Sequence, residues 1–275
     1  MRGLDELLER HRARLTRAHR VRNGAQLVSF VDAVGFCFAF TPAAGLPIPA
    51  AFDHLSTSDE HRKWAWMWGW KDELPQEKRV YYGPILARKP TLVSLRLLPV
   101  LYATFGRAGE PDDHLEDIRA GRLSDVARRI IEHLTQKGES QTRRMRAELG
   151  ITSKDGRTAY DKALDDVQRL MYVARVKAVG EGREEYNYTY DLFVRRYPEV
   201  VRAAGPLASA DARARVLARA VELSGGLTEK QAAKLFDWGE EPLRRTVERL
   251  CAKGAVVRRE RGREAILLLP EYAAA

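Results

Sequence analysis

Apolar residues recur at helical spacing through the second half of the chain, and polar or glycine-rich breaks separate the stretches. The first stretch begins at Ser124, a favourable N-cap, and ends at Gly138, with its apolar side chains on one face (Val126, Ile130, Ile131 and Leu134). The same spacing predicts a short helix over 142–149 and a third helix over 158–171. Three helices therefore follow one another within about fifty residues.

Two strand-like runs, 172–179 and 185–192, follow the third helix and flank a glycine-rich turn at 180–183. The same order then returns. Thr228 and Gln231 form a capping-box pair at the start of the second helix of this copy. Its predicted helices and strands are 211–223, 228–236 and 242–253, then 255–259 and 264–269.

Three helices followed by a β-hairpin is the order of a winged helix, in which the third helix enters the DNA major groove. We therefore expect a mainly α fold with small β-hairpins (α+β), tandem winged-helix domains in the C-terminal half and an aromatic-rich N-terminal domain. The expected divisions are a basic helix or arm over 1–22, an aromatic-rich domain over 23–120 that allows a divergent winged helix, and winged-helix domains over 121–200 and 201–275.

The N-terminal domain is less regular. An apolar run around Gly35 predicts a helix passing into a strand, and a proline-rich loop follows. Tryptophans then alternate at positions 64, 66, 68 and 70, and as a strand they would share one face. Such a face fits a packed hydrophobic surface or a platform for stacking bases, with Trp66, Trp68, Trp70 and Tyr82 as the stacking candidates.

The distribution of charge along the chain indicates a class of binding partner. The 275 residues include 47 Lys or Arg and 38 Asp or Glu, which gives a net charge of +9. The excess lies in residues 1–22 and 121–275, while 23–120 is slightly acidic. Basic stretches on ordered elements indicate a polyanion partner such as DNA.

The cysteine count and the apolar runs exclude several protein classes. The two cysteines, Cys37 and Cys251, form no C-x-x-C pair, which excludes a disulfide scaffold and a cysteine zinc module and fits the cytoplasm. The first twenty residues have no apolar run, and the run from 92 to 105 is too short and too broken for a bilayer. We expect a cytoplasmic, nucleoid-associated protein with no membrane contact.

The candidate DNA contacts follow the predicted helices and wings. The third helix of the first copy also carries Asp161, Asp165 and Asp166, which would repel phosphate. The alternative for that helix is therefore that it faces away from DNA. The wing of the second copy is the densest basic segment. The full set is Arg143, Arg144, Arg157, Lys162, Arg183, Arg244, Arg245, Arg249, Lys253, Arg258, Arg259, Arg261 and Arg263.

These features resemble the winged-helix DNA-binding family of the AlkZ/YcaQ-type crosslink-repair DNA glycosylases. The resemblance rests on the tandem winged helices and on the segments Trp68–Pro75 (WGWKDELP), Tyr81–Gly83 (YYG) and Arg88–Ser94 (RKPTLVS). It implies winged-helix units curved around duplex DNA and metal-free hydrolysis of the N-glycosidic bond of an alkylated purine. One departure is clear: those enzymes carry a Gln-x-Gln catalytic motif, and no two of the six glutamines here are so spaced.

Three functions remain open at the sequence level. The first is DNA binding, duplex or damaged, through the basic wings in DNA repair. The second is a divergent glycosylase in which Asp72 or Glu73 activates water, although each also fits a surface ion pair with a lysine. The third is a non-enzymatic protein-interaction scaffold. His54 and His61 lack a third ligand pattern, so we expect no metal and no cofactor.

Overall fold

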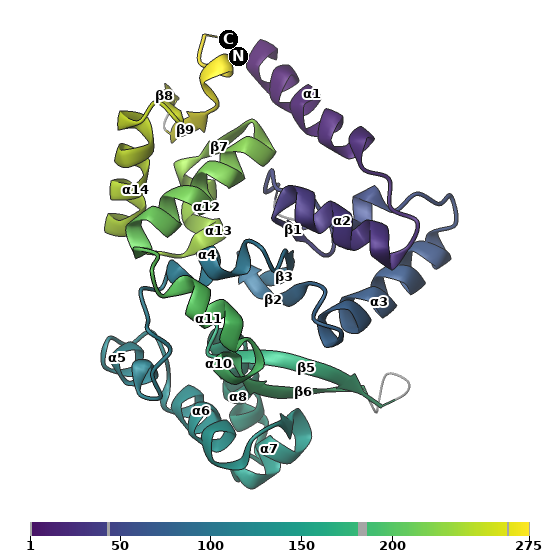
Figure 1. The fold of residues 1–275 in the computed structure, drawn as a ribbon, viewed down its shortest axis with the longest axis vertical. Coiled ribbons are helices and arrows are strands. Elements are labelled where there is room, and N and C mark those ends of the chain that lie inside the picture. Colours follow the sequence, from purple (N-terminus) through teal and green to yellow (C-terminus); the bar gives the residue numbers. More distant parts are fainter. Residues whose placement is uncertain (1, 43–44, 181–185, 263, 275) are drawn as a thin grey trace.

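The computed structural model describes residues 2–42, 45–180, 186–262 and 264–274, and one order of elements occurs three times in it (Figure 1). Each unit has a helix, a short strand, a second helix, a third helix and a β-hairpin. The first unit comprises α2 (Gly24–Val34), β1 (Phe36–Phe38), the 3-10 helix η1 (Ala51–His54), α3 (Glu60–Gln76), β2 (Tyr81–Leu86) and β3 (Lys89–Val93).

The other two units are built from helices and strands of the second half of the chain. The second comprises α6 (Asp125–Lys137), β4 (Ser140–Gln141), α7 (Thr142–Glu148), α8 (Lys154–Arg169), β5 (Val173–Val179) and β6 (Asn187–Leu192). The third comprises α12 (Ser209–Ser224), β7 (Gly226–Thr228), α13 (Glu229–Phe236), α14 (Glu240–Ala252), β8 (Val257–Arg261) and β9 (Glu264–Leu268).

Each unit closes with a small antiparallel sheet of the same topology. The strand orders are β1-β3-β2, β4-β6-β5 and β7-β9-β8, so the last strand of each hairpin is always central. The sheet therefore ties the hairpin to the short strand after the first helix. This topology confirms the α+β class with tandem winged helices and extends the repeat to the N-terminal unit.

Local capping explains the helix boundaries. Ser124 caps α6 by accepting a hydrogen bond from the Ala127 N–H, and Thr228 and Gln231 make both bonds of the predicted capping box. Gly35, with φ of 81°, ends α2 and lets the chain enter β1, as predicted. The helix expected over 158–171 instead begins at Lys154, because the hydroxyl of Ser153 caps it.

The tryptophan segment is a helix, so the prediction of a strand there was wrong. In α3 the side chains two residues apart point to different faces, while those four apart share one. Trp66 and Trp70 accordingly stack, with ring centroids 5.3 Å apart, and Trp64 and Trp68 lie on another face with 51% and 52% of their surface exposed.

Connecting helices and shared cores join the three units. The first and third units bury their apolar side chains in one continuous core that includes α4 (Leu98–Ala103) and α11 (Pro198–Ala204). The second unit, with α5 (Asp113–Arg119) beside it, has a separate core, and α10 (Phe193–Arg196) leads from its sheet into α11. None of the helices of the described chain has the length and apolar composition that crossing a membrane requires.

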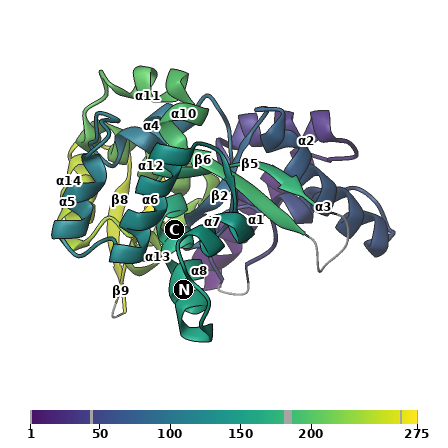
Figure 2. The same cartoon turned by 90° about the horizontal axis from the view of Figure 1, so that it is seen from below.

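The N-terminal helix α1 (Arg2–Ala18) packs on the third unit rather than extending as a free arm. Leu4 and Leu8 are buried against Ile266 and Leu268 of β9, so the two ends of the chain lie side by side (Figures 1 and 2). Gly226 permits this approach, since a Cβ there would lie 2.7 Å from Leu268 and 3.1 Å from Leu8. Burying two leucines stabilises the contact by about 3 to 6 kcal/mol.

Candidate nucleic-acid interface

The third helix of the second unit, α8, has two halves with different surroundings. In its C-terminal half, Asp165 and Asp166 face Arg88 at the tip of the β2–β3 hairpin of the first unit. Arg88 Nη1 donates to Asp166 Oδ1 at 2.6 Å and to Asp165 Oδ2 at 3.4 Å, and Lys162 Nζ lies 3.1 Å from Asp166 Oδ2. These carboxylates are thus neutralised by an interface within the molecule.

The pKa values of the two carboxyl groups reflect different balances of burial and pairing. Burial raises the pKa of Asp166, but the hydrogen bonds from Arg88 and Lys162 outweigh it and hold that pKa below its ordinary value. Burial also raises the pKa of Asp165, and there the more distant Arg88 does not compensate. Asp166 is therefore a firmly anionic partner for the β2–β3 hairpin.

The N-terminal half of α8 and the preceding helix α7 form an exposed surface. Between Thr142 and Lys162 the sequence has six basic and three acidic residues. Arg143, Lys154 and Arg157 are exposed there, and Arg144 pairs with Glu148 at 2.7 Å. The second and third helices of this winged helix therefore present a net positive face to solvent at the edge of the molecule farthest from α1 (Figure 1).

The corresponding surface of the third unit has balanced charges. Residues 229–250 include five basic and five acidic side chains. The arginines that the sequence singled out are largely paired with carboxylates: Arg244 with Glu241 and Glu248, Arg245 with Glu241, Arg249 with Asp211, Arg258 with Glu229 and Glu260, and Arg261 with Asp5. Arg259 donates to the Ala273 carbonyl, and Lys253 is exposed after the end of α14.

The two C-terminal hairpins, whose basic wings the sequence predicted as DNA contacts, do not lie together. In both views β5–β6 and β8–β9 lie on different sides of the molecule (Figures 1 and 2). The first hairpin packs on α3, and the second reaches α1 through Arg261 and Asp5. Two of the predicted wing contacts, Arg183 and Arg263, lie outside the described residues.

Asp72, one of the two candidate catalytic carboxylates, belongs to a buried network between α3 and the β5–β6 hairpin. Lys71 Nζ lies 2.9 Å from both Asp72 oxygens, and the hydroxyls of Tyr186 and Tyr188 also donate to that carboxylate. Lys71 is only 2% exposed, and its Nζ lies 4.1 Å from the Trp68 ring centroid. The carboxylate thus faces three donors, the Lys71 ammonium and the two tyrosine hydroxyls, which occupy the positions from which it would orient water.

Burial lowers the pKa of Lys71 despite the neighbouring Asp72, because desolvation disfavours the ammonium. Next to this network, the guanidinium of Arg175 lies 4.8 Å from the Tyr82 ring centroid and 4.3 Å from that of Tyr188. The cluster of Lys71, Asp72, Arg175, Tyr82, Tyr186 and Tyr188, which we call the α3–wing network, fixes the second wing on the first unit.

The other aromatic candidates differ in accessibility. Tyr82 is buried beneath Arg175, and Trp66 and Trp70 are half-buried and stacked on each other. Trp68 is exposed, and Trp64, which was not among the stacking candidates, is exposed as well. Glu73, the second catalytic candidate, is exposed on α3.

Sequence reasoning did not identify the role of Arg88, which neutralises α8 from 77 and 78 residues away. Its position becomes evident only in the structure, in the turn Ala87–Arg88, where both residues have positive φ although neither is a glycine. Such a turn puts a side chain at a hairpin tip. No group of three His, Cys, Asp or Glu side chains within the described segments is arranged to hold a metal ion.

Comparison with known proteins agrees with this architecture. A family model described as AlkZ related matches residues 21–237. No curated protein matches the sequence. Among solved structures, the chain is similar to the Streptomyces sahachiroi DNA glycosylase AlkZ, with a TM-score of 0.57 and 11% identity, over 96% of this chain and 69% of that one. At that identity the likeness concerns the fold.

Proposed function

Because the chain belongs to the AlkZ-related family, we propose that it binds double-stranded DNA as part of DNA repair. The observation that carries the proposal is the net positive, exposed face of α7 and the first half of α8. In winged helices the corresponding second and third helices approach the duplex, with the third in the major groove.

The contact surface is assigned to the second unit because of the balance of charge. Its face of α7 and the first half of α8, residues 142–162, has six basic residues against three acidic ones, whereas the corresponding stretch of the third unit, residues 229–246, has four of each. Phosphate contacts supply most of the affinity of such proteins, so a balanced face contributes little. Arg88 strengthens the assignment, since it pairs the two carboxylates that would otherwise repel DNA from α8.

The test is a fluorescence-anisotropy titration of labelled duplex DNA with the wild type and two charge-reversal variants. Lys154→Glu/Arg157→Glu is expected to weaken binding at least tenfold for every duplex sequence, because both side chains are exposed on α8. The matched control, Arg244→Glu/Arg245→Glu on α14, makes the same charge change on the balanced face. Equal losses in the two variants would refute the assignment to α8, and unchanged binding in both would refute the proposal.

Exposed Trp64 and Trp68 favour a second candidate function, protein binding through α3. Around them, residues 59–73 have four acidic side chains against three Lys or Arg, which suits a protein partner better than a polyanion. A Trp64→Ala/Trp68→Ala variant should keep duplex binding and lose a partner recovered from nuclease-treated extract. Loss of duplex binding instead would assign these side chains to DNA stacking.

A further inference from the structure

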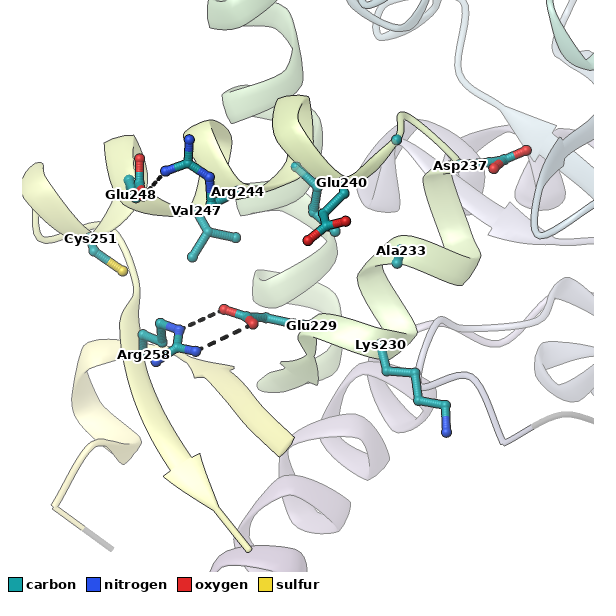
Figure 3. Close-up of a pocket in the computed structure, with 12 residues that line it drawn as sticks. Glu229, Lys230, Ala233, Asp237, Glu240, Arg244, Val247, Glu248, Cys251 and Arg258 are labelled. Carbon is teal, nitrogen blue, oxygen red and sulfur yellow. Dashed lines mark hydrogen bonds and ion pairs between the residues drawn. The ribbon is translucent and has the colours of Figure 1, made fainter. Parts of the chain in front are cut away.

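The third unit contains a cavity of about 830 Å³ between α13, α14 and β8 (Figure 3). Its apolar lining comes from Ala233 on α13 and from Leu243, Val247 and Cys251 on α14. In Figure 3, Val247 points from α14 toward α13. A volume of this size, with an apolar lining and a few polar groups, is typical of pockets for small organic molecules.

The charged residues around this cavity are mostly paired already. Arg258 pairs with Glu229 at 2.7 Å, and Arg244 pairs with Glu248 at 2.5 Å. Of the other charged lining residues, Lys230 lies 3.6 Å from Glu264 and Asp237 lies 3.0 Å from Arg169.

Glu240 is different. It lies in the first turn of α14, is exposed and points into the cavity (Figure 3), and no ion pair of Glu240 is found within the described chain. The cavity therefore combines an apolar interior with one carboxylate that no cationic side chain of the described residues pairs. An occupant that matches both would have an apolar body and a single cationic group.

DNA does not fit this description, since a phosphate backbone would bring negative charge to Glu240 and leave the apolar lining uncovered. From the cavity's size, apolar lining and charge we propose that the third unit binds a small amphipathic organic cation, with its apolar body between α13 and α14 and its cationic group beside Glu240. This function is independent of DNA binding, because the cavity lies on the third unit and the proposed DNA face on the second.

Cys251 allows the location to be tested directly. It lines the cavity and is partly exposed, whereas Cys37, the other cysteine, is fully buried. With thioflavin T, an aromatic cation, as the probe, we expect a saturable rise in its fluorescence and a parallel fall in the rate at which a maleimide modifies Cys251. The rate for free glutathione under the same conditions controls for direct effects of the dye.

Two variants test the chemistry of the site. Glu240→Gln should weaken thioflavin T binding about fivefold, the size of one exposed ion pair. Ala233→Trp places an indole in the cavity and should reduce binding at least tenfold, while Ala252→Trp, an exposed position on α14 outside the cavity, should leave it unchanged. The anionic dye 1-anilinonaphthalene-8-sulfonate should bind more weakly than the cation.

Three results would overturn the proposal: no protection of Cys251, equal effects of the two tryptophan variants, or equal binding of the anionic and cationic dyes. The DNA proposal is tested separately, because Lys154→Glu/Arg157→Glu should leave thioflavin T binding unchanged.

Discussion

Replacing Asp72 by Asn tests whether the α3–wing network holds the first two units together. The substitution preserves the shape of the side chain but removes the charge that Lys71 faces at 2.9 Å. Lys71 is 2% exposed, so its ammonium would stay buried without a counterion. Removing one partner of a buried ion pair costs about 3 to 5 kcal/mol.

We use the lower end of that range, about 3 kcal/mol, because the hydroxyls of Tyr186 and Tyr188 remain as acceptors for Lys71. For a chain of this length the loss corresponds to a fall in Tm of roughly 6 to 12 °C. Circular dichroism at 222 nm during heating measures it. Glu73→Gln is the matched control: the neighbouring carboxylate is exposed, and its loss should change the free energy of unfolding by less than about 0.5 kcal/mol.

The dependence on pH gives an independent check. Without Asp72, Lys71 binds protons less readily in the folded state than in the unfolded state, where its pKa is near the ordinary 10.5. Folding stability of the variant therefore rises with pH up to that value, and the difference from wild type should shrink between pH 7 and 9.5. Equal melting temperatures for Asp72→Asn and Glu73→Gln, or a difference independent of pH, would refute the account of the network.

Three further predictions follow from named contacts. One phosphate contact is expected from each of four basic residues on α7 and α8, namely Arg143, Arg146, Lys154 and Arg157. The logarithm of the DNA association constant should then fall with the logarithm of the salt concentration at a slope of about −3.6, which is a loss of affinity of about 150-fold between 50 and 200 mM salt in anisotropy titrations. A slope near zero would contradict phosphate contacts. Arg88→Met should weaken duplex binding two- to fivefold by leaving Asp165 and Asp166 unpaired, and adding Asp165→Asn/Asp166→Asn should restore it. Burial lowers the pKa of His54, although the ring hydrogen-bonds the His19 carbonyl. The unfolded state therefore binds more protons than the folded state, and the free energy of unfolding falls as the pH drops below 6.5. In urea titrations at pH 7 and pH 5, His54→Asn should show a smaller loss of stability at pH 5 than the wild type.

The repeated order of helices and strands in the second half of the chain could be predicted because the residues that determine it act locally. Ser124, Gly138 and the Thr228–Gln231 box each act within a few residues, so the sequence places those helices directly. The first unit was harder to predict because its second helix is a single 3-10 turn after a proline-rich loop, and because alternating tryptophans imitate a strand. Pairs four apart, Trp64 with Trp68 and Trp66 with Trp70, were the helical signal within the same segment.

The electrostatics of the site could be predicted only in part. Pairs such as Arg244 with Glu241 and Glu248 lie within one helical turn, but other ion pairs form between distant positions. The partner of Arg249 is 38 residues away, and that of Arg258 is 29 residues away. By formal charge, the β8–β9 wing of the third unit is the densest basic segment. Ion pairs with carboxylates nevertheless leave the second unit with the more positive face. Likewise, the sequence could not show that the hydroxyls of Tyr186 and Tyr188, more than 110 residues later in the chain, donate to the carboxylate of the catalytic candidate Asp72.

The docking of α1 on β9 links the N-terminal end of the first unit to the sheet of the third unit. The first and third units are therefore joined twice, through the core that they share and through α1. Detaching the seventeen residues of α1 would remove the second connection and leave the first in place.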